Sequence, residues 1–306
     1  MSRISHRPLS VATMAALALS LAACEVNLNT EGLTTKEKRT FTVSGQPDLT
    51  LETFDGSIEI HSWDRNEVEV EVEKRGMEQS LLDQMTIEAD QQGDRITLRV
   101  KGPAAVEQRG VTIGVHISPA ARLLVAVPRK ALVNARTGDG SIRVENIEGR
   151  LSVRTGDGSI VADRVIGDIE ARSGDGSIRI EKAEGRLDVE TDDGSISLDA
   201  KPTVVRAKSG DGAIRLTLQA DTTMAEAWDL STRDGSITIT LPADFSAEID
   251  AETSDGSVRS SYPGLSDRDE DEDGRERRRR ELRTRLGEGG HILKVRTGDG
   301  SIRFER

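Results

Sequence analysis

A column of aspartates is the feature of this 306-residue chain with the clearest potential for chemistry. The phrase Asp-Gly-Ser-Ile occurs nine times with small changes, and in its densest part successive aspartates are eighteen residues apart. These aspartates are Asp139, Asp157, Asp175, Asp193 and Asp211. If the repeats stack in parallel, the carboxylates stand about 5 Å apart. Such a line could hold Ca²⁺, which binds several carboxylate oxygens.

The same aspartates also have a purely structural interpretation, which we favour. Asp-Gly is a preferred pair in tight turns, where the aspartate side chain bonds the local backbone N–H groups. The glycines and the aspartate spacing differ from those of the Ca²⁺-binding nonapeptide repeat. Basic residues stand three positions before four of the aspartates and could offset their repulsion, and Glu190 breaks this column. The basic residues are Arg136, Arg154, Arg172 and Lys208. The sequence therefore predicts turns, with no metal site and no cofactor.

Each repeat carries two short stretches that alternate between apolar and polar residues. In the first repeat these are Ile142 and Val144, then Leu151 and Val153. A period of two is typical of a strand with one wet face. A second bend is marked by a glycine, a residue free to adopt positive φ. These glycines are Gly149, Gly167 and Gly185. Each repeat thus predicts a coil of two strands and two turns.

A fixed period of this size indicates a solenoid, because one coil cannot bury its apolar face alone. We predict an all-β, single-domain β-solenoid, similar to a parallel β-helix, with 18-residue coils over residues 129–306. A two-sheet antiparallel sandwich is the alternative. The period drifts after Leu216, where turns at Asp234 and Asp255 imply small insertions, and a final coil follows Thr297.

Residues 39–128 predict a less regular β-rich part that covers the first coil of the solenoid. Alternation indicates strands at residues 49–54, 68–73, 96–100, 111–117 and 123–127, and residues 77–85 predict one short helix. An outlying coil is expected at Asp55, where the Asp-Gly-Ser-Ile phrase first occurs.

The N-terminus resembles a bacterial lipoprotein signal. Arg3 and Arg7 precede a short apolar run, which ends in Leu21-Ala22-Ala23-Cys24, the pattern of a lipobox. We expect residues 1–23 to be a signal peptide, Cys24 to be lipidated and residues 24–38 to be a tether. An ordinary secretory signal is the alternative, and the apolar run is too short for a transmembrane anchor. Cys24 is the only cysteine, which excludes a disulfide framework.

The charge balance is acidic. The net charge is −12, and removal of residues 1–23, which carry two basic and no acidic residues, makes it −14. Such a chain is a poor candidate for binding nucleic acid or an anionic lipid surface. Residues 266–290 contain nine acids and eight arginines, with Leu282 and Leu286 almost the only apolar residues. We expect this stretch to be a mobile charged insertion without a core, helical near residues 276–286.

The combination of a lipobox with β-repeats resembles the bacterial "putative adhesin" domain family. The repeats carry Thr-Gly-Asp-Gly-Ser-Ile at Thr137, and the phrase returns at Thr155 and Thr297, with variants at Ser173 and Ser209. The resemblance covers about residues 40–306. It implies an extracytoplasmic β-solenoid-like domain and little about molecular activity.

Enzymatic activity is not expected. The histidines His61, His116 and His291 lie outside the regular repeats, and the chain has seven aromatic residues, of which Trp63 and Trp228 also lie outside them. The sequence predicts a non-enzymatic cell-envelope lipoprotein, a scaffold or adhesin-like module, with its binding residues undetermined. It would be anchored outside the cytoplasm by the lipid, in the outer membrane of a Gram-negative cell, with an envelope protein or a surface polysaccharide as partner. The alternatives are an envelope-stress accessory protein and, more remotely, a polysaccharide-active β-helix enzyme.

Overall fold

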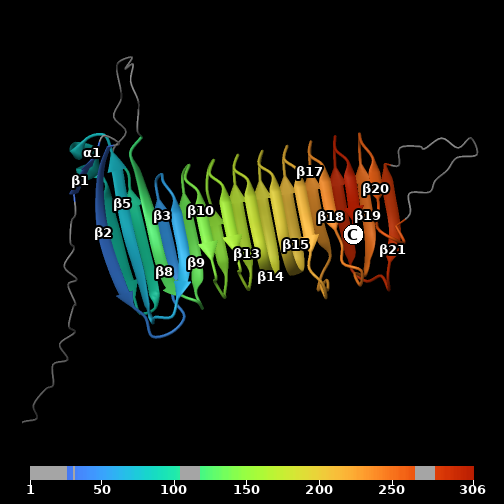
Figure 1. The fold of residues 1–306 in the computed structure, drawn as a ribbon, viewed down its shortest axis with the longest axis horizontal. Coiled ribbons are helices and arrows are strands. Elements are labelled where there is room, and N and C mark those ends of the chain that lie inside the picture. The colour runs from blue at the N-terminus through green and yellow to red at the C-terminus, as the bar shows by residue number, and fades with distance from the viewer. Residues whose placement is uncertain (1–25, 30–31, 104–117, 266–279) are drawn as a thin grey trace, which may run out of the picture.

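The molecule is a row of strands that lie across its long axis (Figure 1). The computed structural model describes residues 26–29, 32–103, 118–265 and 280–306. Their 23 strands form one continuous sheet that is folded into two facing layers. Strands β14 (Ile178–Thr191) and β15 (Ile196–Ser209) join the layers, because each of them runs through both. The chain is therefore all-β and solenoid-like, as the sequence predicts.

The first layer contains the strands that follow the Asp-Gly turns, and at its N-terminal end four further strands, β1, β2, β5 and β8. Its spatial order is β1 (Val26–Asn29), β2 (Gly32–Thr42), β5 (Glu67–Gly76), β8 (Ala120–Pro128), β4 (Ile58–Trp63), β10 (Ile142–Glu145), β12 (Ile160–Asp163), the first halves of β14 and β15, β16 (Ile214–Leu218), β18 (Ile237–Thr240), β23 (Ile302–Glu305) and β20 (Val258–Ser260).

The second layer contains the strands that precede these turns, together with β6, β7 and β21 at its two ends. Its spatial order is β6 (Thr86–Gln92), β7 (Arg95–Lys101), β3 (Asp48–Thr53), β9 (Leu132–Thr137), β11 (Leu151–Arg154), β13 (Ile169–Ser173), the second halves of β14 and β15, β17 (Trp228–Thr232), β22 (Ile292–Thr297), β19 (Ala247–Thr253) and β21 (Glu281–Leu286). The short helix α1 (Gln79–Gln84) lies between β5 and β6 in the chain and confirms the helix predicted at residues 77–85.

The repeats pair in parallel and in register. Ile142 is opposite Ile160, Ile160 is opposite Ile178, and Ile178 is opposite Ile196, an offset of eighteen residues at each step. The second layer shows the same pairing between Leu151 and Ile169. The antiparallel sandwich is therefore wrong for this part of the chain.

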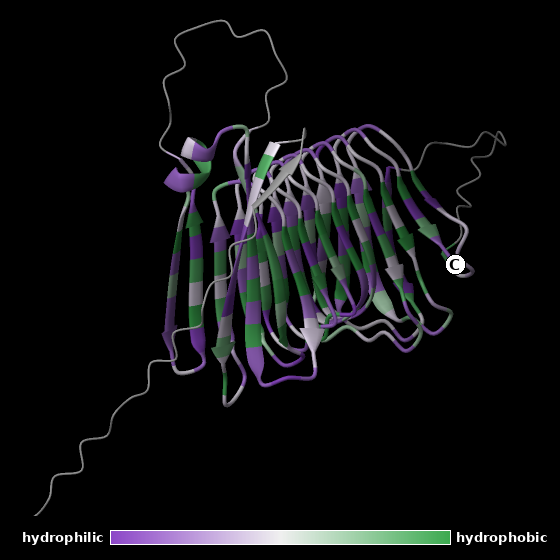
Figure 2. Cartoon of the chain, turned by 60° about the vertical axis from the view of Figure 1, so that its left-hand side comes forward, coloured by the Kyte–Doolittle hydropathy of each residue, from purple (hydrophilic) through white to green (hydrophobic). Residues whose placement is uncertain are grey.

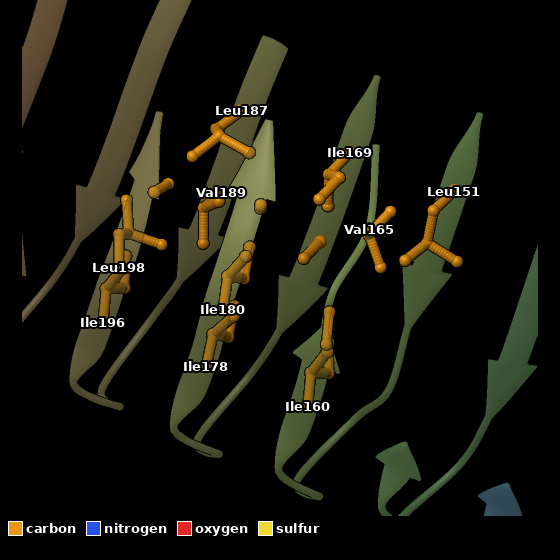
Figure 3. Close-up of a cluster of buried hydrophobic side chains, with 14 of the residues drawn as sticks. Leu151, Ile160, Val165, Ile169, Ile178, Ile180, Leu187, Val189, Ile196 and Leu198 are labelled. Carbon is orange, nitrogen blue, oxygen red and sulfur yellow. The ribbon is translucent and has the colours of Figure 1, made fainter. Parts of the chain in front are cut away.

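The core fills the space between the two layers. Green and purple bands alternate along the strands in Figure 2, because successive side chains point to opposite faces. Figure 3 shows the inward side chains of neighbouring coils packed against one another, among them Ile160, Ile178 and Ile196. Each of these isoleucines is at most 1% exposed. Stacking of the coils thus buries the apolar side chains that a single coil would leave exposed to water.

The second bend needs glycine in three of the repeats, as the sequence predicts. Gly149, Gly167 and Gly185 have φ values of 145°, 136° and 118°. A Cβ atom at Gly167 would also overlap the carbonyl oxygen of Gly149 in the neighbouring coil. Glycine therefore serves both the backbone conformation and the close approach of coils at these three positions.

The spatial order of the coils differs from their order in the chain at both ends. Ile58 on β4 pairs with Leu123 on one side and with Ile142 on the other, so the coil at Asp55 is interior and not outlying. Ile302 on β23 pairs with Ile237 and with Val258. The coil that follows Thr297 therefore lies between two coils that precede it in the chain. The chain therefore forms the outer coil with β20 first and afterwards adds β23 between β20 and β18.

The prediction of a tether at residues 24–38 is wrong for its described part. Residues 32–38 belong to β2, which pairs with β5 along its whole length, and β1 pairs with β2. Lys36 and Lys38 on β2 form ion pairs of 2.8 and 2.7 Å with Glu71 and Glu69 on β5. The β5 partners of residues 33–38 lie more than thirty residues away in the chain, so the local sequence pattern does not reveal this strand.

The prediction of a coreless, partly helical insertion at residues 266–290 is also wrong for its described part. Residues 281–286 form β21, which pairs antiparallel with β19. Leu282 and Leu286 are 5% and 6% exposed, so the two apolar residues of this stretch join the core. The strand alternates apolar with charged residues, and this alternation was available in the sequence. Antiparallel β21 covers the edge of β19, as an exposed sheet edge requires.

Three predictions lie outside the described residues: the signal peptide at residues 1–23 with Cys24, the strand at residues 111–117, and the part of the charged insertion at residues 266–279. In the part of the chain that the structure describes, no helix has the length and hydropathy to cross a membrane.

Candidate functional site

The aspartate column lies on the outside of the Asp-Gly turns. Asp139, Asp157, Asp175, Asp193 and Asp211 are all exposed. The described residues contain no group of three or more histidine, cysteine or acidic side chains placed to hold a metal ion. Within this part of the chain the column is a row of solvated carboxylates, one of which, Asp211, forms an ion pair with Arg233.

A buried hydroxyl makes the turn hydrogen bonds that the sequence analysis assigned to the aspartate. Thr155 Oγ1 accepts a hydrogen bond of 3.3 Å from the N–H of Gly158 in its own turn. It also donates one of 2.7 Å to the carbonyl oxygen of Gly140 in the preceding coil. Ser173 repeats the arrangement with Gly176 and Gly158 at 3.1 and 2.8 Å. The hydroxyl therefore closes its own turn and bonds that turn to the turn of the preceding coil.

These hydroxyls form a ladder along the molecule. Eight of them donate to a glycine carbonyl of the neighbouring coil, and all eight are less than 8% exposed. In spatial order they belong to Thr137, Thr155, Ser173, Thr191, Ser209, Thr232, Thr297 and Thr253. The signal for them was the threonine or serine that stands two positions before each aspartate.

In the regular coils the glycine of Asp-Gly is required by close approach and not by its own φ, whereas Gly56 of the first Asp-Gly has a φ of 111°. A Cβ atom at Gly158 would overlap the carbonyl oxygen of Gly140, and one at Gly176 would overlap that of Gly158. Neither glycine has positive φ. The turns are thus packed backbone on backbone, and this leaves no space at the turn for a side chain or a ligand between coils.

The basic column before the aspartates pairs with carboxylates on the second layer and not with the aspartates. Arg172 forms ion pairs with Glu190 and, at 3.0 Å, with Glu170. Lys208 donates a hydrogen bond of 3.0 Å to Glu190. This bond, together with the charges of Lys208, Arg172 and Arg154, lowers the pKa of Glu190 below its ordinary value. Glu190 stands at the one acidic position of the basic column, and two residues of that column, Arg172 and Lys208, pair with it.

The outer face of the first layer carries two parallel rows of side chains. The arginine row contains, in Cα register, Arg143, Val161, Arg179, Ser197, Arg215, Thr238, Arg303 and Arg259. The acid row beside it contains Glu145, Asp163, Glu181 and Asp199, and then Thr217, Thr240 and Glu305. The acid row thus has no acid in the two coils of Thr217 and Thr240, where the arginine row holds Arg215 and Thr238.

A cleft of about 360 Å³ lies near the C-terminal end of the molecule. Its lining includes Phe245, Tyr262, Arg285 and Arg306. The Tyr262 hydroxyl donates to the carbonyl oxygen of Pro242 at 2.8 Å, and Arg285 is paired with Glu248 at 2.8 Å. Among the described residues that line the cleft, no side chain is a carboxylate, a histidine or a cysteine.

The histidines and tryptophans singled out in the sequence do not converge on one place. His61 lies on β4 and His291 precedes β22, both exposed, and His116 lies outside the described residues. Trp228 is 1% exposed, and its indole N–H donates to the carbonyl oxygen of Thr203 at 3.1 Å. Trp63 donates to the carbonyl oxygen of Glu67 at 2.8 Å and lies under the guanidinium of Arg65. Both tryptophans are engaged in packing.

The class of protein that these observations define is a repetitive all-β scaffold, whose turns hold the coils together and whose chemistry lies on its outer faces. The sequence profile of the Toastrack DUF4097 family matches residues 46–305, and the chain belongs to that family. The resemblance recognised in the repeats is thereby confirmed. A search among curated proteins gives no match.

Several solved structures have a similar arrangement over most of their length. A "putative adhesin" from Bacteroides fragilis is 11% identical, with a TM-score of 0.44 over 88% of this chain and 96% of its own. A "putative lipid binding protein" from Parabacteroides distasonis is 13% identical, with a TM-score of 0.42 over 89% and 97%. A "putative adhesin" from Parabacteroides merdae is 9% identical, with a TM-score of 0.41 over 89% and 96%. At these identities and TM-scores the likenesses carry no argument about what this chain binds.

Proposed function

We propose that this protein is a non-enzymatic cell-envelope lipoprotein, a β-solenoid with eighteen-residue coils that displays an adhesin-like binding surface outside the cytoplasm. The observation that carries the proposal is the hydroxyl ladder. It runs without a break through the coils, from Thr137 to Thr253, and makes them one stiff body. A stiff body with long flat faces suits the display of a surface better than the enclosure of a substrate.

The absence of catalytic activity is part of the proposal. Hydrolases and lyases built from stacked coils need an irregular cluster of acids and bases on one face. The described residues have their acids spread along columns, and some of them, such as Glu190 and Asp250, are paired with arginines. Among the described residues that line the cleft near Phe245 and Tyr262, no side chain is acidic.

Attachment to a membrane is proposed from the sequence alone. The lipobox Leu21-Ala22-Ala23-Cys24 supports lipidation of Cys24, and Glu25 after it supports the outer membrane in a Gram-negative cell. The alternative of an envelope-stress accessory protein drew on residues 266–290 as a free charged arm. Because residues 281–286 form β21, we do not carry that alternative further.

Incorporation of labelled palmitate followed by fractionation tests the anchor. We expect the wild-type chain to carry label and to sediment with membranes. The Cys24→Ala variant should carry no label and should be released. Label that persists in Cys24→Ala would refute the lipoprotein assignment. Binding to isolated cell-surface material by the wild type, but not by a heat-unfolded sample, tests the display of a folded binding surface.

A further inference from the structure

Arg215 is the first arginine of the arginine row whose neighbour in the acid row is not an acid. In the earlier coils Arg143 lies 3.6 Å from Glu145, and Arg179 lies 3.7 Å from Glu181. The corresponding neighbour of Arg215 is Thr217, and among the described residues Arg215 has no carboxylate within ion-pair distance. The next acid in that row is Glu305, which forms an ion pair of 3.8 Å with Arg303, comparable to those of Arg143 and Arg179.

The excess of positive charge is concentrated on four neighbouring strands. Arg259 on β20 is directly opposite Arg303 on β23, and β23 is separated from Arg215 on β16 by β18. All three arginines are exposed. At a strand spacing of about 4.8 Å, Arg215 and Arg303 stand about 10 Å apart. Like charges directly opposite each other destabilise a sheet. Glu305 offsets this repulsion in part at Arg303, whereas Arg259 has no carboxylate within ion-pair distance among the described residues.

We infer that this surface, made of Arg215, Arg303 and Arg259 with the hydroxyls of Thr217, Thr238 and Thr240 among them, binds a linear polysaccharide that carries carboxylates. The guanidinium group presents a planar pair of N–H donors that fits a carboxylate. The threonine hydroxyls can donate to or accept from sugar hydroxyls. The inference rests on the proposed function and names the chemistry of its ligand.

The shape of the surface favours an extended polymer over an acidic peptide. The arginines lie in one row across β16, β18, β23 and β20, on a flat outer face. Strand β18 is paired on both sides, with β16 and β23, and β23 is paired with β18 and β20. A peptide that binds by strand addition needs a free edge. Strands β16, β18 and β23 are paired on both sides and offer only side chains, and of the four strands β20 alone has a single partner, β23, among the described residues.

The composition of the surface disfavours the other common polyanions. Single-stranded nucleic acid is held largely by stacking on exposed aromatic rings. The aromatic residue of these four strands, Phe304, is fully buried. Anionic membranes attract clusters of four to eight basic residues, and here three arginines stand on a chain of net charge −12. Carboxylates spaced along a sugar chain match three separated guanidinium groups.

Binding of the full chain, purified in detergent, to immobilised polygalacturonate tests the inference. Neutral dextran, polydeoxythymidine and phosphatidylglycerol vesicles serve as comparison surfaces. We expect binding to polygalacturonate that weakens at high salt, and weaker binding to the other three. The triple variant R215Q, R259Q, R303Q should lose affinity by about tenfold or more, since three charge-assisted contacts are removed. Its melting temperature should be unchanged or higher, because the repulsion between Arg259 and Arg303 is gone.

Two control variants sharpen the test. The double variant R143Q, R179Q changes the same row where the acids are present, and it should bind as the wild type does. The double variant T217E, T240E extends the acid row and keeps every arginine, and it should lose binding as the triple variant does. An equal loss in R143Q, R179Q, or binding retained in T217E, T240E, would overturn the inference.

The comparison surfaces separate this inference from the proposed function. A wild type that binds cell-surface material but not polygalacturonate refutes the polysaccharide assignment and leaves the binding module standing. Equal binding to polydeoxythymidine or to the vesicles refutes the choice of a carboxylated sugar polymer. A wild type that binds no cell-surface material refutes the proposed function itself.

Discussion

The hydroxyl of Thr155 donates a hydrogen bond of 2.7 Å to the carbonyl oxygen of Gly140, fifteen residues earlier in the chain and one coil away in space. The bond is possible because both residues lie in turns whose backbones touch. Gly158, which stands over Gly140, has no side chain to separate them. One buried hydroxyl per turn therefore converts a set of similar turns into a continuous connection along the molecule.

Removal of one hydroxyl of this ladder should be costly. Thr191 is 1% exposed, donates to the carbonyl oxygen of Gly176 at 3.0 Å and accepts from the N–H of Gly194 at 3.2 Å. The Thr191→Val variant keeps the shape and leaves both buried groups without a partner, so we expect a loss of about 1–3 kcal/mol in the free energy of unfolding. Denaturant unfolding measures it. Thr191→Ser is the matched control, because Ser173 and Ser209 make the same bonds; an equal loss in both variants would contradict the role of the hydroxyl.

The inward and outward faces of one strand should respond very differently to truncation. Ile178 is 1% exposed and lies in the apolar column between Ile160 and Ile196. Ile178→Ala should lower the free energy of unfolding by about 2–5 kcal/mol. The neighbouring Arg179 is exposed, and Arg179→Ala should change it by less than about 0.5 kcal/mol. Similar denaturation midpoints for the two variants would mean that the facing of β14 is misassigned.

The ion pairs around Asp250 should make stability depend on pH. Arg296 on β22 donates a hydrogen bond of 2.6 Å to Asp250 on β19 and lowers the pKa of its carboxyl, and Arg283 on β21 adds to the effect. The depressed pKa stabilises the fold above the unfolded value of about 3.9, and this contribution is lost as the pH falls through the folded pKa. Asp250→Asn should therefore cost about 1 kcal/mol or less at neutral pH, since the pair is partly solvated.

Thermal unfolding of the wild type and Asp250→Asn between neutral pH and about pH 3 checks this expectation. The two curves should converge as the pH falls. Asp229→Asn serves as the control, because Asp229 lies 3.9 Å from Lys294 and has a looser pair to lose. A difference between wild type and Asp250→Asn that grows towards low pH would reverse the sign and refute the assignment.

The aspartate column should not respond to Ca²⁺. Asp175 is exposed, and the hydroxyl of Ser173 makes the hydrogen bonds of its turn. Asp175→Asn should therefore be tolerated, with a small gain from reduced repulsion between neighbouring carboxylates. Melting curves with millimolar Ca²⁺ and with chelator should differ only by the effect of ionic strength. A rise in melting temperature that is specific to Ca²⁺ and absent in Asp175→Asn would make the column a metal site by mass action.

Much of the fold is predictable from the sequence because the repeats are nearly identical. Ile142, Ile160 and Ile178 recur at a fixed interval, and equal spacing leaves parallel stacking as the arrangement that buries all three. The same reasoning finds the bend glycines, since Gly149, Gly167 and Gly185 stand at one position of the repeat. The helix α1 was found from its own local pattern.

The parts that were missed depend on partners that are distant in the chain. Residues 32–38 look like a polar tether, and only the pairs that Lys36 and Lys38 make with β5 make them a strand. The hydrogen bonds of the turns are predicted for the wrong residue. Asp-Gly is a familiar turn pair, and this draws attention away from the threonine or serine two positions before the aspartate. The arginine row was not recognised either. Arg215 and Arg303 lie two strands apart in space and 88 positions apart in the sequence.

The placement of the coil after Thr297 between two earlier coils has a consequence for biosynthesis. A chain made from its N-terminus can stack each coil as it emerges as far as β17 and β18, but β19 and β20 find no partner there. Their parallel neighbours, β22 and β23, come later in the chain. Until then the edges of β17 and β18 stay open, and open edges invite pairing with other chains. The edges of β17 and β18 are therefore paired only after residues 291–305 have been synthesised. A product truncated before these residues would keep both edges unpaired.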